Sequence, residues 1–512
     1  RLELAADDST AEKAAATLRK RLRPAGDSVL FFTLELGKIP LATQRTFLTH
    51  PALSHFRYFL TQIFTHAKHD LTEAEEKIIR LKSTQSSHLW QEMTEKLIST
   101  SAVSWKGKSV PLPEAFEKLD TLKSADKPKL WAKIIAVLDG FGIPAEHEFN
   151  AIINDARTED DVRGYKKPYS ATALAYEHDE KSIETLVSTM STRGFALSRK
   201  FYRAKAAYHG VDALLYAQKY DSVGEQPVIP FAEALTICRD VFYQVNNEYG
   251  QIFDSMLTRG QIDVYPKKGK RGGAFMSHGT GHPIQVMLNH TDTLKALETL
   301  AHEMGHAVHA ARSQAKNSPL YDGHSIVTAE TASTLFENLV FDALISAADT
   351  KTKTVLLHDK ITRDIATMQR QIAFFNCELE IHNTIHATGA MTHAELKNCM
   401  HRHLSSYLGD AVIVQPEDGA SYVHIPHLRY GFYVYSYTFG HLMSSLIAKR
   451  YQEDNSYRKE IDTFLTAGAS DTVIHIFKKI GLDTTKPETF TEALKAHAKD
   501  ITTWATLARK NV

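Results

Sequence analysis

Two histidines four residues apart, with a glutamate directly after the first, are the residues of this chain best suited to carry out chemistry. The segment LAHEMGHAVHAARSQ (300–314) contains His302, Glu303 and His306. Residues four apart on an α-helix lie on one face about 6 Å apart along the axis, so both imidazoles can reach one ion. Two imidazole ligands suit Zn²⁺, and a carboxylate beside them can take a proton from a metal-bound water. The spacing therefore predicts a zinc site with Glu303 as general base.

The sequence around the motif predicts the helix that this spacing requires. Thr291, Asp292 and Thr293 are all suitable N-cap residues, because their side-chain oxygens can accept hydrogen bonds from the first helical N–H groups. Pro319 bounds the other end. We predict a helix from about residue 293 to residue 315.

A catalytic zinc ion needs a third protein ligand and an open coordination position. The segment SIVTAETASTLFENLVFDALISA (325–347) predicts an amphipathic helix whose apolar face carries Glu330 and, seven residues later, Glu337. A carboxylate on a buried face is costly unless it is paired or bound to a metal, and a core salt bridge is the alternative to a metal site. We predict Glu330 as the third ligand and Glu337 as the residue that orients a ligating histidine. The spacing alone allows the two roles to be exchanged.

The overall composition favours a soluble globular protein. The 512 residues include 60 basic and 60 acidic residues, so no net field attracts nucleic acid or an anionic membrane. No apolar run approaches the roughly 18 residues of a membrane helix, and the first residues lack the apolar core of a signal peptide. Three widely spaced cysteines suit a reducing compartment. We expect a cytoplasmic protein, a monomer or small homo-oligomer, without nucleic-acid or membrane partners.

Most of the chain has the apolar spacing of helices, including residues 178–218, where we predict two helices separated near Gly194. Residues 263–290 differ, because they are rich in glycine and then contain the short apolar run IQVML. This pattern predicts a loop followed by a short strand. We expect the strand, around Ile284–Leu288, to pair with an extended peptide by edge addition.

The region around the motif also resembles a known family. The segment GGAFMSHGTGHPIQVMLNHTDTLKALETLAHEMGHAVH (272–309) is similar to the catalytic segment of the thimet oligopeptidase and oligoendopeptidase F family of zinc peptidases, and more closely to oligoendopeptidase F. The family motif HExGHxxH is matched by His302, Glu303, Gly305, His306 and His309. The family's third ligand is a glutamate about one helix later, which corresponds to Glu330 rather than Glu337. The resemblance continues through HIPHLRYGFYVYSYTFG (424–440).

The resemblance implies a mainly α-helical, two-lobed metallopeptidase that encloses a deep substrate channel, with a small β-sheet beside the zinc helix. Residues 1–160 would form an N-terminal helical lobe and residues 161–512 the catalytic domain. One Zn²⁺ per chain would be held by His302, His306 and Glu330. The implied activity is hydrolysis of internal peptide bonds in short unstructured peptides. His309 is expected to be structural or to support a ligand rather than to bind the metal.

Substrate contacts are expected from the histidine- and tyrosine-rich segment, because family members use such side chains there to bind the scissile carbonyl and the substrate backbone. Packing of an aromatic stripe in the core is the alternative for any one tyrosine. The preferred order for the residue that stabilises the oxyanion is Tyr435, Tyr430 and then Tyr433. The expected catalytic residues are Glu303, Tyr435, Tyr430 and His427, and the expected substrate-binding residues are His424, Tyr433, Gly273 and Ala274.

Two other functions remain open from the sequence. A non-catalytic peptide-binding relative would keep the fold, but it has no need of the general base Glu303 beside a complete ligand set. A zinc aminopeptidase would need a carboxylate-rich subsite for the free amine of its substrate, and the sequence shows no such cluster. Comparing cleavage of end-blocked and free peptides distinguishes the second alternative.

Overall fold

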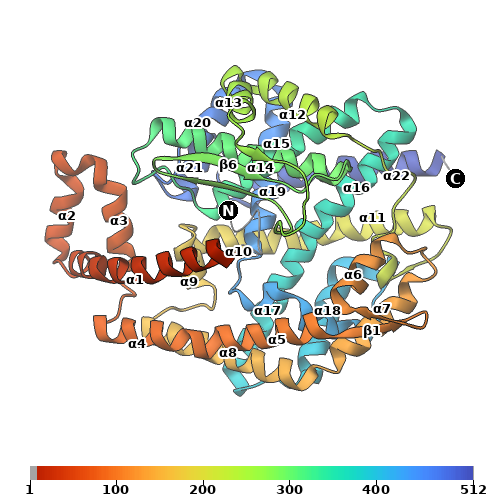
Figure 1. Cartoon of the computed structure of the whole chain (residues 1–512), viewed down its shortest axis with the longest axis horizontal. Coiled ribbons are helices and arrows are strands. Elements are labelled where there is room, and N and C mark those ends of the chain that lie inside the picture. Colours follow the sequence, from red (N-terminus) through yellow and green to blue (C-terminus); the bar gives the residue numbers. More distant parts are fainter. Residues whose placement is uncertain (1–8, 511–512) are drawn as a thin grey trace. The chain divides into compact units, whose positions relative to one another are not determined.

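The computed structural model describes residues 9–510, which form two compact units that are discontinuous in sequence. The first unit contains residues up to Ile79, Gln226–Ala343 and Arg450–Gly481, and the second contains Arg80–Glu225, Leu344–Lys449 and the chain from Leu482. Helices dominate both units, with only small sheets, which confirms the predicted mainly helical fold (Figure 1). The division at residue 160 into a lobe and a catalytic domain stays a prediction.

The first unit is built around one long central helix, α14 (Leu294–Lys316), in contact with neighbouring helices and with a sheet. The other helices of this unit are α1 (Ser9–Gly37), α2 (Leu41–Thr49), η2 (Pro51–Phe56), α3 (Arg57–His66), α12 (Phe231–Val245), α13 (Asn247–Thr258), η9 (Asn455–Tyr457), α20 (Arg458–Thr466) and α21 (Val473–Lys479). Thr293 caps α14, since its Oγ1 accepts a hydrogen bond from the Ala296 N–H at 3.2 Å. The predicted span of 293–315 agrees with α14 to within one residue at each end.

Three strands form the sheet beside α14, in the order β4 (Ile262–Asp263), β6 (His282–Met287) and β5 (Phe275–Gly279) (Figure 1). The strands β5 and β6 form an antiparallel hairpin, and β4 runs parallel to β6. The sequence predicted β6 but not β5. Because β6 is the central strand, its N–H groups are occupied on the β4 side, where Val286 donates to the Gln261 carbonyl at 2.9 Å. The prediction that a peptide adds to the edge of this strand is therefore wrong.

The second unit is also mainly helical. Its helices are η3 (Thr84–His88), α5 (Leu89–Thr100), α6 (Leu112–Thr121), α7 (Lys127–Asp139), α8 (Gly142–Arg163), α9 (Ser170–Ala175), α10 (Glu180–Thr189), η4 (Met190–Gly194), α11 (Phe195–Tyr208), η5 (Tyr216–Gln218), α16 (Thr350–Thr367), α17 (Gln369–Thr388), α18 (His393–Leu408), η6 (Gly409–Ala411), η7 (Pro416–His424), η8 (Pro426–Arg429) and α22 (Pro487–Lys510). Two small sheets pair β1 (Ala102–Trp105) with β2 (Lys108–Pro111) and β3 (Leu214–Leu215) with β7 (Val412–Ile413). The unit boundary falls within α4 (Glu73–Ser83), α15 (Ile326–Ala347) and α19 (Tyr435–Glu453).

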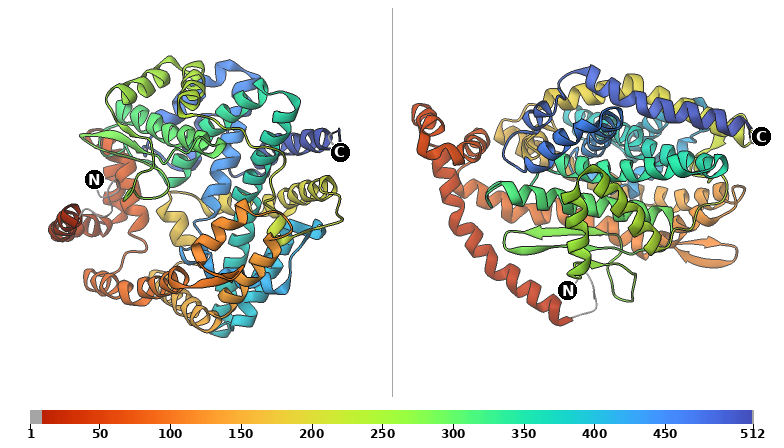
Figure 2. Two further views of the ribbon diagram at one scale, coloured as in Figure 1. Left: turned by 45° about the vertical axis from the view of Figure 1, so that its right-hand side comes forward. Right: turned by 90° about the horizontal axis from the view of Figure 1, so that it is seen from above.

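Long helices of the second unit pack along one another. The C-terminal helix α22 contacts both α11 and α16 (Figure 2), and Lys360 on α16 forms an ion pair with Asp500 on α22 at 2.7 Å. The predicted break near Gly194 is a single π-helical turn, η4, between α10 and α11. Within residues 9–510, no helix combines the length and the apolar character that crossing a bilayer requires.

Candidate metal centre and substrate-binding segments

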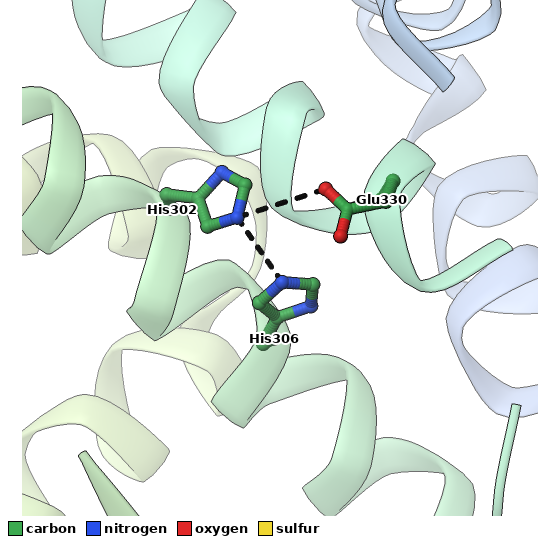
Figure 3. Close-up of side chains that lie close together, drawn as sticks. All are labelled: His302, His306 and Glu330. Atoms are coloured by element: carbon green, nitrogen blue, oxygen red, sulfur yellow. Dashed lines mark hydrogen bonds and ion pairs between the residues drawn. The ribbon is translucent and has the colours of Figure 1, made fainter. Parts of the chain in front are cut away.

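The helices α14 and α15 bring the three predicted metal ligands together (Figure 3). The Nε2 atoms of His302 and His306 lie 3.1 Å apart, and Glu330 Oε2 lies 3.8 Å from His302 Nε2. One ligand atom from each of the three residues lies within 4.8 Å of the other two. Two ligands that each bind Zn²⁺ at about 2.1 Å in a tetrahedral arrangement are separated by about 3.4 Å. The three side chains are therefore spaced as ligands of a single ion.

Glu337 lies on the opposite side of the His302 ring from the ligand atoms. Its Oε1 is 3.1 Å from His302 Nδ1, whereas Glu330 faces His302 Nε2. A carboxylate that accepts the Nδ1–H fixes the tautomer and leaves the Nε2 lone pair free for a metal. The two glutamates thus face different nitrogens of the same imidazole ring, and their roles as ligand and as orienting residue stay a prediction.

Gly305 allows α14 and α15 to approach closely enough to share a metal. A Cβ atom at this position would lie 2.8 Å from Ser333 Cα and 3.2 Å from the Ala332 carbonyl oxygen, both on the backbone of α15. Backbone atoms cannot move aside as the end of a flexible side chain can. The glycine of the motif therefore sets the distance between the helix that carries the histidines and the helix that carries Glu330.

The ionisable groups of this centre shift one another's pKa values. Burial disfavours a charged His302 ring, but the hydrogen bond and charge of Glu337, together with Glu330 and Glu303, raise the pKa of His302 to about 9. Burial raises the pKa of Glu303 to about 7 and also raises the pKa of Glu330. Burial and the neighbouring His302 hold the pKa of His306 well below its usual value. A divalent cation would supply the positive charge that these carboxylates need while both imidazoles stay neutral.

Glu303 lies in the wall of a cavity of about 520 Å³ within the first unit. Its Oε2 atom is buried and has no hydrogen-bond partner among the described residues. Residues that line the cavity include His302, Glu303, Glu337, Gly273 and Ala274. The structure thus brings the expected base and one ligand together with two of the expected substrate-binding residues.

The outer edge of β5 faces the metal helix. Met276 of β5 lies opposite Val286 of β6. The Val286 N–H donates to the Gln261 carbonyl, on the other side of β6. Met276 and Val286 therefore form a non-hydrogen-bonded pair. The N–H and C=O groups of Met276 therefore point away from β6. The Met276 backbone also acts on the Glu303 carboxyl, where it opposes the rise in pKa that burial causes. The strand edge beside the metal centre is β5, which the sequence did not predict.

His309 is a packing residue of the first unit. It is only 1% exposed, and its ring stacks on His324 with centroids 3.9 Å apart and on Phe464 at 5.7 Å. It is not among the residues whose ligand atoms converge with His302 and His306. Its structural position accords with the role expected for it.

In the second unit, four side chains of the histidine- and tyrosine-rich segment form one cluster. The ring of His427 stacks on Tyr433 with centroids 5.4 Å apart, and the hydroxyls of Tyr433 and Tyr437 lie 3.3 Å apart. The ring of Tyr430 contacts that of Tyr433 at 5.9 Å and is 47% exposed. The sequence assigned roles to three of these residues but none to Tyr437, because its spacing on α19 does not distinguish it from the other tyrosines.

Two other residues expected from this segment are packed into the second unit. Tyr435, the first residue of α19, is fully buried and its ring contacts those of His178 and Phe375. Its hydroxyl has no hydrogen-bond partner among the described residues. His424 stacks on Phe116 at 4.6 Å, and burial lowers the pKa of His424 to about 4. Tyr435 is therefore a packed side chain, whereas His424 lines a cavity of about 310 Å³ in the second unit together with His427.

A buried ion pair fixes the start of this segment. Arg429 donates from Nε and Nη2 to the two carboxylate oxygens of Glu148 at 2.7 and 2.9 Å. It also donates to the backbone carbonyls of Val423 and Ile425, both at 2.9 Å. Each of the three guanidinium nitrogens thus has at least one partner, and four of the five N–H groups are used, as suits a buried guanidinium. The backbone that carries His424 and His427 is held by α8.

A strained turn follows the ion pair. Gly431 and Phe432 both have left-handed backbone angles, with φ of 66° and 62°. The Phe432 N–H donates to Glu378 Oε1 at 2.8 Å, and Thr172 donates to the Gly431 carbonyl at 2.6 Å. A bulky residue in this conformation costs about 1–3 kcal/mol and persists only where its surroundings fix it. The turn therefore determines where Tyr430 and Tyr433 lie.

Two protein-family models match this chain. The model of peptidase family M3 matches residues 237–496, which include every residue of both segments described above. The chain belongs to peptidase family M3. A second family model, described as Oligopeptidase F, matches residues 35–100. The predicted resemblance is thereby confirmed.

Several proteins named oligopeptidase or oligoendopeptidase are similar to this chain. Oligopeptidase PepF of Bacillus subtilis is 30% identical over 65% of this chain, and the match spans 50% of the relative's own length. Group B oligopeptidase PepB of Streptococcus agalactiae is 24% identical over 94% of this chain and 82% of the relative. Chromosomal oligoendopeptidase F of Lactococcus lactis is 28% identical over 72% of this chain and 60% of the relative.

Solved structures share the fold. A protein of Chlamydophila abortus has a TM-score of 0.88 with 22% identity, over 98% of this chain and 86% of that protein. Oligoendopeptidase F of Enterococcus faecium has a TM-score of 0.74 with 20% identity, over 94% of this chain and 84% of the other. At these identities the likeness concerns the helical fold alone.

Proposed function

We propose that this M3 family member is a zinc-dependent oligoendopeptidase that hydrolyses internal bonds of short unstructured peptides. The observation that carries the proposal is the convergence of His302, His306 and Glu330 beside Glu303 in the wall of a cavity. Three protein ligands leave one tetrahedral position open, which is the arrangement of catalytic rather than structural zinc. The names of the M3 relatives, oligopeptidase and oligoendopeptidase, support the substrate class.

Zn²⁺, when bound by these three ligands, would act as a Lewis acid and lower the pKa of a coordinated water. Glu303 is the general base, because burial raises its pKa to about 7 and so poises the carboxyl to exchange a proton near neutral pH. It takes a proton from the attacking water and returns it to the leaving amine. Glu337 holds His302 in the tautomer that presents Nε2 to the ion.

We assign substrate backbone binding to the outer edge of β5. Gly273 and Ala274, which directly precede β5, line the cavity, and the N–H and C=O of Met276 point away from β6. Main-chain pairing with an extended peptide would give binding that tolerates many side chains. The backbone that leads into β5 is held by Asn289, whose side-chain amide donates to the Gly273 carbonyl at 2.8 Å.

We assign stabilisation of the oxyanion to the cluster of Tyr430, Tyr433, Tyr437 and His427. Its exposed member Tyr430 is the leading candidate, since a hydroxyl must reach the substrate to donate a hydrogen bond. Tyr435, which the sequence ranked first, becomes a packing residue in this proposal because its ring is fully buried.

The proposal includes one Zn²⁺ per chain at the catalytic centre and a cytoplasmic location. The three cysteines are buried and free, which accords with a reducing compartment. A monomer or small homo-oligomer, with short peptides as its partners, remains our expectation.

An internally quenched, end-blocked peptide tests the activity. Zinc-loaded protein should cleave it, a chelator should abolish cleavage, and added Zn²⁺ should restore it. Cleavage of peptides with a free N-terminus only would favour a zinc aminopeptidase. Binding without cleavage across a varied peptide set, by protein shown to contain zinc, would favour a non-catalytic peptide-binding relative.

A further inference from the structure

A second group of metal-ligating side chains lies in the second unit, on the helical hairpin formed by α17 and α18. Cys377 and Glu380 are three residues apart on α17, and Cys399 and His403 are four apart on α18. These spacings place each pair on one face of its helix. The two helices are antiparallel neighbours joined by residues 389–392, so the two faces meet.

Three of these side chains converge, and the fourth, Cys377, contacts one of the three. The Cys377 and Cys399 sulfurs lie 3.6 Å apart, and His403 Nε2 lies 2.9 Å from Glu380 Oε2. One ligand atom from each of Glu380, Cys399 and His403 lies within 4.8 Å of the other two. Two thiolates bound to Zn²⁺ at about 2.3 Å are separated by about 3.8 Å in a tetrahedral site. The spacing of the two sulfurs is therefore close to that of two ligands on one ion.

Burial and charge also suit a cation here. Both cysteines are fully buried, whereas the side chains of His403 and Glu380 remain 18% and 39% exposed, which gives an ion a path from solvent. Two thiolates, one carboxylate and a neutral imidazole around Zn²⁺ carry a net charge of about −1. Arg402 forms an ion pair with the other oxygen of Glu380 and offsets that charge.

We propose that Cys377, Glu380, Cys399 and His403 form a second metal site, a closed structural site for Zn²⁺ that fastens α17 to α18. Four protein ligands complete a tetrahedral shell and leave no position for a substrate. Binding of the ion releases the protons of the two thiols, and no oxidant or reductant is involved. The site is independent of the proposed peptidase activity.

A disulfide between Cys377 and Cys399 accounts less well than a metal for the arrangement of the four side chains. A bond between the sulfurs needs a separation of about 2.05 Å, so the two helices would have to move together. Such a bond would also leave the approach of Glu380 and His403 to Cys399 unexplained. A metal would use these three side chains at separations close to those observed, with the Cys377 sulfur 3.6 Å from the Cys399 sulfur.

Cobalt is a suitable probe because thiolates bound to Co²⁺ give a charge-transfer band in the near ultraviolet, and the catalytic centre contains no thiol. The full-length, reduced protein should bind two metal ions per chain and show this band. The variant Cys399→Ala should bind one ion and lose the band. The matched variant Cys238→Ala, which removes a buried thiol of the first unit, should retain both ions and the band.

Wild-type protein alone also tests the site if Cys399→Ala does not fold. Zn²⁺ should displace Co²⁺ and abolish the band, and it should raise the thermal unfolding temperature of a protein whose catalytic centre is already filled. Absence of the band from folded, reduced, Co²⁺-treated wild type would overturn the proposal. Recovery of Cys377 and Cys399 as a disulfide from zinc-treated protein would also overturn it. Failure of peptide cleavage would bear only on the first centre.

Discussion

The two groups of metal-ligating side chains are built on the same helical spacings but differ in what surrounds them. At the first centre, two histidines on α14 face one glutamate on α15, and an unpartnered carboxylate oxygen of Glu303 lies in the wall of a cavity of about 520 Å³. On the α17–α18 hairpin, a glutamate, a cysteine and a histidine converge, and a second cysteine contacts the first. Three ligands beside a cavity leave a coordination position open for a reaction, whereas a shell of four protein ligands leaves none.

The comparison shows that two ligand residues at helical spacing indicate a metal site but do not indicate whether that site is catalytic or structural. An i, i+4 pair of ligands occurs at both groups, as His302 with His306 and as Cys399 with His403. The difference lies in the neighbours. Glu303 beside the first pair has its pKa raised to about 7 by burial and can exchange protons. At the second group the corresponding carboxylate, Glu380, is paired with Arg402 and His403.

The sharpest test of this difference is Glu303→Gln, which removes the base and leaves the three ligands. We expect kcat to fall by about 10²–10⁴-fold, the usual contribution of general acid–base catalysis, while the zinc content stays the same. Steady-state kinetics and metal analysis on one preparation measure both quantities. Glu298→Gln, the same substitution one turn earlier on α14, is the matched control. A zinc-loaded Glu303→Gln protein with full activity would refute the role of the base.

A smaller effect is expected from Glu337→Gln, which changes the residue that orients His302. The amide keeps the shape of the side chain but loses the charge that favours the Nδ1–H, so zinc affinity should fall by about 10–100-fold. Competition with a chelator of known affinity measures the change. Asp342→Asn on the same helix is the control. Unchanged affinity in Glu337→Gln would mean that His302 is positioned by packing alone.

Gly305→Ala tests whether the distance between α14 and α15 matters for the metal. The added Cβ would meet Ser333 Cα at 2.8 Å, and overpacking of this kind typically costs about 1–3 kcal/mol of stability. Zinc affinity should fall as well, because the helices must separate. The control is Gly323→Ala, where an added Cβ meets open space. Denaturant unfolding and chelator competition are the measurements, and equal behaviour of the two variants would contradict the argument.

The metal centre was predictable from the sequence because its geometry follows from helix periodicity. The spacing of His302 and His306 and the amphipathic pattern around Glu330 need only regular α14 and α15, and both helices form as predicted. The i, i+7 separation of Glu330 and Glu337 left their roles open. It was the family resemblance that assigned them, and the structure places them on opposite sides of the His302 ring.

Helix and strand periodicity did not predict the regions whose geometry depends on a turn, on an irregular strand or on contacts between distant residues. The order of the tyrosines depends on a turn in which Phe432 has φ of 62°, a conformation that no spacing rule predicts for a phenylalanine. The strand β5 was missed because FMSHG lacks a clear alternation of apolar and polar residues. The thiol site was missed because Cys377 and Cys399 are 22 residues apart on different helices, and only the hairpin brings them together.

The smallest predicted effect is a change with pH in the free energy of unfolding of the second unit. It must be known separately, because metal binding by the α17–α18 hairpin would also make the stability of this unit depend on pH. Lys205 is fully buried and donates to the Lys219 carbonyl at 2.8 Å, and burial lowers its pKa from 10.5 to about 7. Between these values the unfolded chain holds a proton that the folded protein does not, so this lysine makes stability rise with pH, by at most about 1.4 kcal/mol per pH unit. Below the folded pKa both states are protonated and the slope vanishes.

Lys205→Met removes this proton and keeps the volume of the side chain. Urea unfolding of metal-free wild type and variant at pH 6, 7, 8 and 9 should give free energies of unfolding that differ by a constant at low pH. Above pH 7 the wild type should gain stability relative to the variant. The charge of Lys205 is one of the groups that lower the pKa of the nearby Lys219, so the difference between the two proteins reports the titration of this pair of lysines. If the free energies of unfolding of wild type and variant stay parallel from pH 6 to 9, Lys205 keeps its proton in the folded protein. The pH dependence of zinc binding by the α17–α18 hairpin would then need no correction for Lys205.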